Sequence, residues 1–144
     1  MILISHRGNI SGKNPNLENE QIYCQKAIDS GYNVEIDVYF YDGILWTGHD
    51  KPQYRVDDDF LLREEVWCHA KDIMALKRLL ELGTHCFFHQ NDPVTLTSKG
   101  YIWTYPTQPL TEKSICVKPE VQLVALKHSA GVCSDYIQKY EDLR

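Results

Sequence analysis

Short apolar runs rich in β-branched and aromatic residues alternate with segments of helical spacing along this chain. We expect helices over residues 18–30 and 73–82, because apolar positions recur there at helical intervals and a glycine follows each segment. An alternation of strands and helices is typical of parallel βα units. The expected strands are runs at residues 1–5, 33–40, 66–70, 85–89, 101–104, 114–117 and 131–134, with a short return strand at 44–46.

Length and charge limit the classes of protein to which the chain can belong. Its 144 residues suit one domain, 1–144, and exclude two of full size. Its 15 Lys and Arg against 20 Asp and Glu argue against a general nucleic-acid binder, which needs clustered basic residues. The sequence has no apolar run of about 18 residues, and its first apolar stretch is too short for a signal peptide. We therefore expect a cytoplasmic protein without stable membrane insertion; its oligomeric state stays open.

Five cysteines are odd in number, widely spaced and set mostly in apolar runs. No C-x-x-C pair accompanies them, so the pattern favours buried free thiols over disulfides or a zinc site.

Polar residues are concentrated at the ends of the expected strands. In a parallel barrel these ends converge on one mouth, where such side chains would meet. The residues are His6, Arg7, Glu35, Asp37, His49, Asp50, His69, Lys71, His89 and Asp92.

The strand at 33–40 alternates strictly, so Glu35 and Asp37 share one face. Two such carboxylates offer hard oxygen ligands for Mg²⁺, Ca²⁺ or Mn²⁺, although a solvated strand face is the simpler interpretation. Histidines from other strands could move protons, and Arg7 could hold a planar anion such as phosphate. His69 lies in an apolar run, where a packing role is the alternative to a role as a ligand.

Six motifs, in order, resemble those of the glycerophosphodiester phosphodiesterases, within the phospholipase-C-like phosphodiesterase superfamily. The resemblance is specific over residues 2–50 and weaker beyond. The matching elements are His6-Arg7-Gly8, Asn16-Leu17-Glu18-Asn19-Glu20, Ala27 with Gly31, Glu35-Ile36-Asp37-Val38, Asp42-Gly43 and His49-Asp50, followed by Cys68-His69-Ala70-Lys71 and Gly131-Val132-Cys133-Ser134-Asp135-Tyr136.

The resemblance implies an α/β fold, here a miniature or incomplete TIM-type (β/α) barrel with reduced C-terminal helices, because the chain is far shorter than a usual barrel of about 250 residues. It implies a divalent metal at Glu35 and Asp37 and acid/base catalysis by His6 and His49. It also places Arg7 and Glu18 in the metal or phosphate shell. His69 stands where the family has a third metal carboxylate, so that a softer metal would suit the site.

The expected function is hydrolysis of a glycerophosphodiester-like or related small phosphodiester, an activity of lipid metabolism. The metal, Arg7 and Lys71 would stabilise charge on the phosphoryl group. One alternative is a non-catalytic homologue that binds metal and phosphate. Another is a sugar- or nucleotide-phosphate-processing protein in which His89 and Asp92 define a different substrate.

Overall fold

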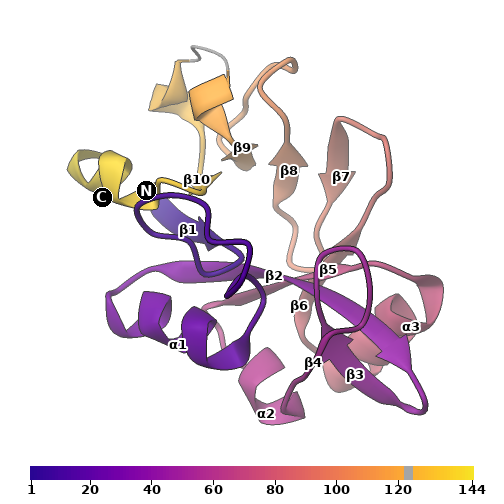
Figure 1. Cartoon of the computed structure of the whole chain (residues 1–144). Helices are drawn as coiled ribbons and strands as arrows, with labels where there is room; N and C mark the ends of the chain where they lie inside the picture. Colours follow the sequence, from indigo (N-terminus) through magenta and orange to yellow (C-terminus); the bar gives the residue numbers. More distant parts are fainter. Residues whose placement is uncertain (122–124) are drawn as a thin grey trace.

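The computed structural model describes residues 1–121 and 125–144, and its strands form one mixed sheet curled into a half-barrel (Figure 1). The strands are β1 (Ile2–His6), β2 (Asn33–Tyr41), β3 (Ile44–Thr47), β4 (Tyr54–Arg55), β5 (Val66–Ala70), β6 (His85–Phe88), β7 (Val94–Leu96), β8 (Ile102–Thr104), β9 (Ser114–Val117) and β10 (Gly131–Ser134). The helices are α1 (Gln21–Asp29), α2 (Asp58–Leu61) and α3 (Ile73–Leu82), with 3₁₀ turns η1 (Pro119–Val121), η2 (Leu126–His128) and η3 (Ile137–Leu143).

Parallel pairing runs through the centre of the sheet, in the order β6-β5-β2-β1-β10-β9-β8. Strands β3 and β4 extend the end of β2 as an antiparallel hairpin, and β7 is an antiparallel edge beside β8. Neighbouring parallel strands run in the same direction, so their carboxyl ends, and the polar residues at those ends, lie at the same end of the sheet.

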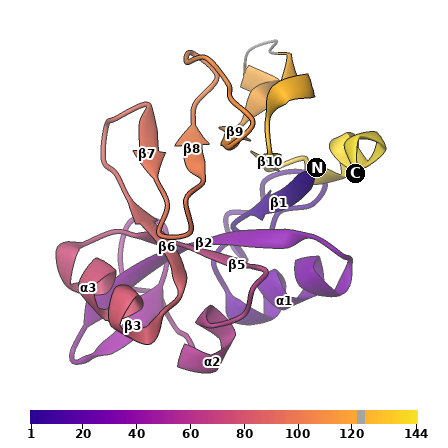
Figure 2. The ribbon, with the colours of Figure 1, turned by 180° about the vertical axis from the view of Figure 1, so that it is seen from behind.

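The expected TIM-type barrel is wrong. Among the described residues β6 pairs with β5 alone, and β8 pairs with β9 and the antiparallel β7, so the sheet does not close. No α-helix follows Leu82 in the ranges 83–121 and 125–144. A closed barrel needs a complete ring of strands and an outer layer of helices. The fold is instead mostly sheet, with helices covering one part of its outer face (Figure 2).

The local elements agree closely with the expected ones. The helix at 73–82 has the expected bounds: the Asp72 carboxylate accepts a hydrogen bond from the Ala75 amide, and Gly83 ends the helix at a φ of 82°. Helix α1 is shorter at both ends than the expected 18–30. The strands β4 and β7 and helix α2 were not expected, because each is very short.

Two apolar cores lie on opposite faces of β2 and β5. On the outer face, Val34 and Ile36 of β2 pack with Cys68 of β5 against helices α1, α2 and α3. On the inner face, Trp67 and Phe87 pack against strands β8, β9 and β10. All five cysteines are buried and free, which confirms that prediction. None of the helices in the described ranges could span a bilayer, since none has the length and apolarity required.

We expect His85 to make the stability of the fold depend on pH. Its ring packs on Trp67, with 3.8 Å between ring centroids, and Nε2 lies 2.8 Å from the Thr97 hydroxyl. Burial, with a smaller effect from the charge of Lys99, lowers the pKa of His85 to about 4.

A histidine that resists protonation in the fold stabilises it only while the ring is neutral. We expect this contribution to be complete above about pH 6.5 and to disappear as the pH falls toward 4. Urea unfolding between pH 7.5 and 4 measures it, with His85→Gln as the comparison. If wild type and variant lost stability equally over this interval, His85 would not be the source.

Candidate active site

A cavity of about 300 Å³, here called the main cavity, lies at the carboxyl ends of the parallel strands. Among the described residues three Lys or Arg side chains and one carboxylate line it, which favours an anionic ligand. The lining residues are His6, Arg7, Glu35, His69, Lys71, His89, Gln90, Trp103, Tyr105, Val117 and Lys118.

The alternation of β2 directs its two carboxylates to the inner face. Residues Val34, Ile36 and Val38 belong to the outer core, so Glu35 and Asp37 point the other way. Their exposed fractions are only 2% and 0%. The pair is therefore buried, and the alternative of a solvated strand face is wrong.

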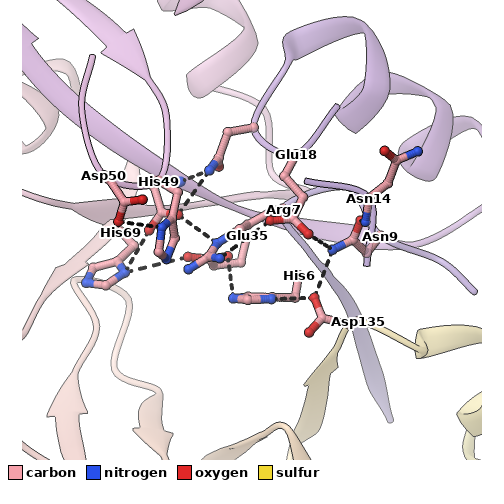
Figure 3. Close-up of polar contacts among 12 residues, drawn as sticks. His6, Arg7, Asn9, Asn14, Glu18, Glu35, His49, Asp50, His69 and Asp135 are labelled. Atoms are coloured by element: carbon pink, nitrogen blue, oxygen red, sulfur yellow. Dashed lines mark hydrogen bonds and ion pairs between the residues drawn. The ribbon is translucent and has the colours of Figure 1, made fainter. Parts of the chain in front are cut away.

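Glu35, Asp37 and His69 form a compact group that could hold a metal ion. One ligand atom from each lies within 4.8 Å of the other two. Nδ1 of His69 is 3.2 Å from Oδ1 of Asp37 and 3.6 Å from Oε1 of Glu35 (Figure 3). Register places Asp37 of β2 directly opposite His69 of β5, which explains why the two side chains meet.

Two further cations contact Asp37. Nε of Arg7 is 2.8 Å from Oδ2, and Nζ of Lys71 is 3.5 Å from Oδ1. Burial raises the pKa of Asp37, but the hydrogen bond with His69 and the charges of Arg7 and Lys71 outweigh burial and hold this pKa far below its usual range. Asp37 is thus a buried anion behind the wall of the main cavity, in contact with the lining residues Arg7, His69 and Lys71.

Asn19 fixes the position of Asp37 from both sides. Its Nδ2 donates to Oδ2 of Asp37 at 3.0 Å, and its Oδ1 accepts from the Asp37 amide at 2.8 Å. Asn19 is fully buried and has a φ of 68°. Asn19 belongs to the loop motif Asn16-Leu17-Glu18-Asn19-Glu20, but no role was predicted for it; its place in that motif is the one sequence signal of this contact.

The imidazole of His69 carries a proton in the protein alone. Burial lowers its pKa, but hydrogen bonds to Asp37 and Glu35 outweigh burial and raise it to about 9. The ring stacks on Phe87 and His89, at centroid distances of 5.0 and 4.6 Å. The packing role of His69 is therefore confirmed, and its role as a metal ligand stays a prediction.

His6 is held at the edge of the main cavity by a carboxylate. Its Nδ1 lies 2.6 Å from Oδ1 of Asp135, which also accepts from Asn9 at 2.8 Å, and its Nε2 lies 3.8 Å from Glu35 (Figure 3). Burial raises the pKa of Asp135, but the hydrogen bond from His6 outweighs it and lowers this pKa to about 2. Asp135 was quoted only within the C-terminal motif, and its orienting role was missed.

Three other expected site residues lie outside the group formed by Glu35, Asp37 and His69. Oε2 of Glu18 is 3.6 Å from Arg7, and Oε1 accepts from Asn9, so Glu18 belongs to the outer shell of charges. His89 lines the main cavity. Burial and the charge of His69 lower the pKa of His89 to about 4, so it is neutral. Asp92 is exposed and lines a neighbouring hollow.

His49 and Asp50 lie outside the lining of the main cavity. Nδ1 of His49 is 2.7 Å from Oδ1 of Asp50, and 49% of the His49 side chain is exposed. The Gly48 amide donates to the Asp37 carbonyl, and the Tyr39 hydroxyl donates to that of His49, which anchors this loop to β2. The structure therefore does not bring His6 and His49 together as the resemblance implies.

Two cationic residues of the main cavity adopt the left-handed backbone region, which is uncommon outside glycine. The φ angles are 56° for Arg7, after β1, and 52° for Lys118, after β9. Unfavourable backbone conformations of this kind are concentrated at functional sites. Lys118 was not expected from the sequence, because only the fold brings β9 beside the other site strands.

The donor set fits a divalent cation. One of its buried oxygens, Oε2 of Glu35, has no hydrogen-bond partner among the described protein atoms, and its neighbour, Nε2 of His6, is 3.8 Å away. Buried carboxylate oxygens are costly unless a donor or a cation meets them. Two carboxylates and one imidazole suit Mn²⁺ or Zn²⁺ better than Ca²⁺, which prefers oxygen ligands alone.

Comparison of the chain with protein-family models, with curated proteins and with solved structures finds no match.

Proposed function

We propose that the protein is a metal-dependent phosphodiesterase that acts on a small phosphodiester in the main cavity. The observation that carries the proposal is a cavity lined by Glu35, His69, Arg7, Lys71 and Lys118, with the buried carboxylate of Asp37 in contact with three of these residues behind its wall. The motif resemblance to glycerophosphodiester phosphodiesterases supports the same reaction class. A cytoplasmic location belongs to the proposal as well.

Charge complementarity supports a phosphate ligand. The guanidinium of Arg7 and the ammonium groups of Lys71 and Lys118 would attract the anionic diester and stabilise charge that develops on its phosphoryl oxygens. A divalent cation held by Glu35, Asp37 and His69 would polarise these oxygens further. His69 must give up its proton to become a ligand, because a metal binds only the neutral imidazole.

Proton transfer is assigned to His6. Asp135 holds Nδ1, so Nε2 is the nitrogen free to accept the proton of the attacking water or substrate hydroxyl. The new P–O bond then forms as the bond to the leaving alkoxide breaks. Protonation of that alkoxide by His49 would require its side chain to turn away from Asp50 toward the main cavity.

Hydrolysis of bis(p-nitrophenyl) phosphate tests the proposal. We expect turnover with Mn²⁺ present, its loss after removal of the metal with EDTA, and recovery when Mn²⁺ is restored. The cations Arg7, Lys71 and His69 also balance the buried carboxylates without a metal, which favours a binding module as the second candidate. A rise in melting temperature with inorganic phosphate, together with no turnover in the presence of any divalent ion, would support the binding module and contradict the enzymatic function.

A further inference from the structure

A second hollow, here called the side hollow, adjoins the main cavity. It measures about 330 Å³ and shares His89, Gln90 and Tyr105 with the lining of the main cavity. The loops after β6 and β8 form its walls, and they lie next to one another in both views of the ribbon (Figures 1 and 2). A hydrogen bond of 3.0 Å from the Tyr105 amide to the Pro93 carbonyl joins the two loops.

The two spaces differ in chemistry. The atoms that face the main cavity are mostly polar, whereas those that face the side hollow are mostly apolar. Pro93, Pro106 and Val121 line the side hollow and not the main cavity, and Tyr105 lies between the two. Apolar walls of this kind gain free energy when they cover an apolar group, but they offer little to a hydroxyl-rich group such as glycerol.

The lining residues that the two spaces share determine how a substrate could lie across both of them. Arg7, Lys71 and Lys118 would hold the phosphoryl group of a substrate in the main cavity, because these charges are absent from the lining of the side hollow. An ester group of the same phosphate would then extend past Tyr105 toward Pro93 and Pro106. The shared lining thus favours a part of the substrate itself as the occupant of the side hollow.

We propose that the side hollow binds an apolar alcohol group esterified to the phosphate, so that the substrate is a phosphodiester with one aromatic or alkyl ester arm. This proposal rests on the proposed phosphodiesterase function, and it deepens that function by naming the substrate class. It departs from the glycerol ester that the motif resemblance suggests.

Titration calorimetry with two phosphate monoesters tests the side hollow separately from turnover. With Mn²⁺ present, we expect phenyl phosphate to bind about 10-fold more tightly than methyl phosphate, because the ring is removed from water. Thr107 is exposed at the wall of the hollow, and Thr107→Trp should fill it and abolish the preference. Gln108→Trp is the matched control, since Gln108 is the next residue and does not line the hollow.

The outcomes separate the two proposals. Equal affinities for the two esters in the wild type, or a preference that survives in Thr107→Trp, would overturn the side hollow as a binding site even if diesters are hydrolysed. A phenyl preference that is lost only in Thr107→Trp supports the hollow. If the protein prefers phenyl phosphate but hydrolyses no diester, the side hollow is supported as a ligand site and the phosphodiesterase function is contradicted.

Discussion

We expect His6→Ala to lower kcat for bis(p-nitrophenyl) phosphate by about 100- to 10,000-fold, the usual cost of losing a general acid or base. His6 ends β1, lines the main cavity and is oriented by Asp135 at 2.6 Å, so the variant removes an imidazole that a carboxylate holds 3.8 Å from Glu35. Steady-state kinetics at saturating Mn²⁺ measure the loss, and circular dichroism verifies that the variant is folded.

Substitutions of two other histidines serve as comparisons for this test. His128 is exposed on the 3₁₀ turn η2, and His128→Ala should leave kcat unchanged. The resemblance predicts that His49→Ala is as damaging as His6→Ala, whereas the half-exposed position of His49 leads us to expect a loss of about 10-fold or less. Near wild-type activity in His6→Ala would remove His6 from the mechanism, and an equal loss in both variants would mean that His49 turns into the cavity.

Asp37→Asn should reduce the free energy of unfolding by about 3–5 kcal/mol, the typical cost of removing one partner from a buried charge cluster. Asp37 is fully buried and contacts Arg7, Lys71 and His69, so the amide would leave these cations without their shared counter-charge. The pKa of Asp37, far below its usual range, expresses the same stabilisation of its charged form. Urea unfolding at pH 7 without added metal measures the change.

Asp50→Asn is the matched control, because the Asp50 side chain is 87% exposed and its contact with His49 is at the surface. We expect that substitution to change the free energy of unfolding by less than about 1 kcal/mol. If Asp37→Asn were equally mild, the buried cluster would contribute little to the fold, and the contacts of Asp37 would not have the strength inferred from their burial.

Much of the local structure could be predicted from the sequence, because local signals determine it. Helix α3 has a periodic apolar face, the cap residue Asp72 and the terminating Gly83, and its bounds agree with the prediction. The strict alternation of β2 correctly places Glu35 and Asp37 on one face. Their burial could not be predicted, because it depends on side chains from other parts of the chain, among them His6, Arg7 and Asn19.

The prediction of a closed barrel was wrong for a similar reason. Apolar runs and turns predicted the positions of the strands, but closure depends on the pairing of β6 with β8, and the intervening β7 turns back as an antiparallel edge. That hairpin leaves no helix between β6 and β8 to carry the chain across the outer face. The resemblance over residues 2–50 covers only β1, α1, β2 and β3, and therefore contained no information on this half of the sheet.

The candidate site was predicted in part. Glu35, Asp37, His69, Arg7 and Lys71 were expected together, and the structure gathers them within one group of contacts. Asn19, Asp135 and Lys118 received no role, because a lone polar residue after a short strand or in a loop carries no periodic signal. His49 was assigned by motif alone, and the hairpin β3–β4 directs its side chain to Asp50 instead of the main cavity.

Titration of Mn²⁺ into the metal-free wild-type protein by calorimetry tests the central claim most directly. The account predicts saturable binding of about one ion per chain, with release of the proton that His69 carries, visible as a heat that varies with the ionisation enthalpy of the buffer. No saturable heat with Mn²⁺, Mg²⁺ or Zn²⁺ would contradict it, and would mean that Glu35, Asp37 and His69 form a buried ion-pair cluster that holds no metal.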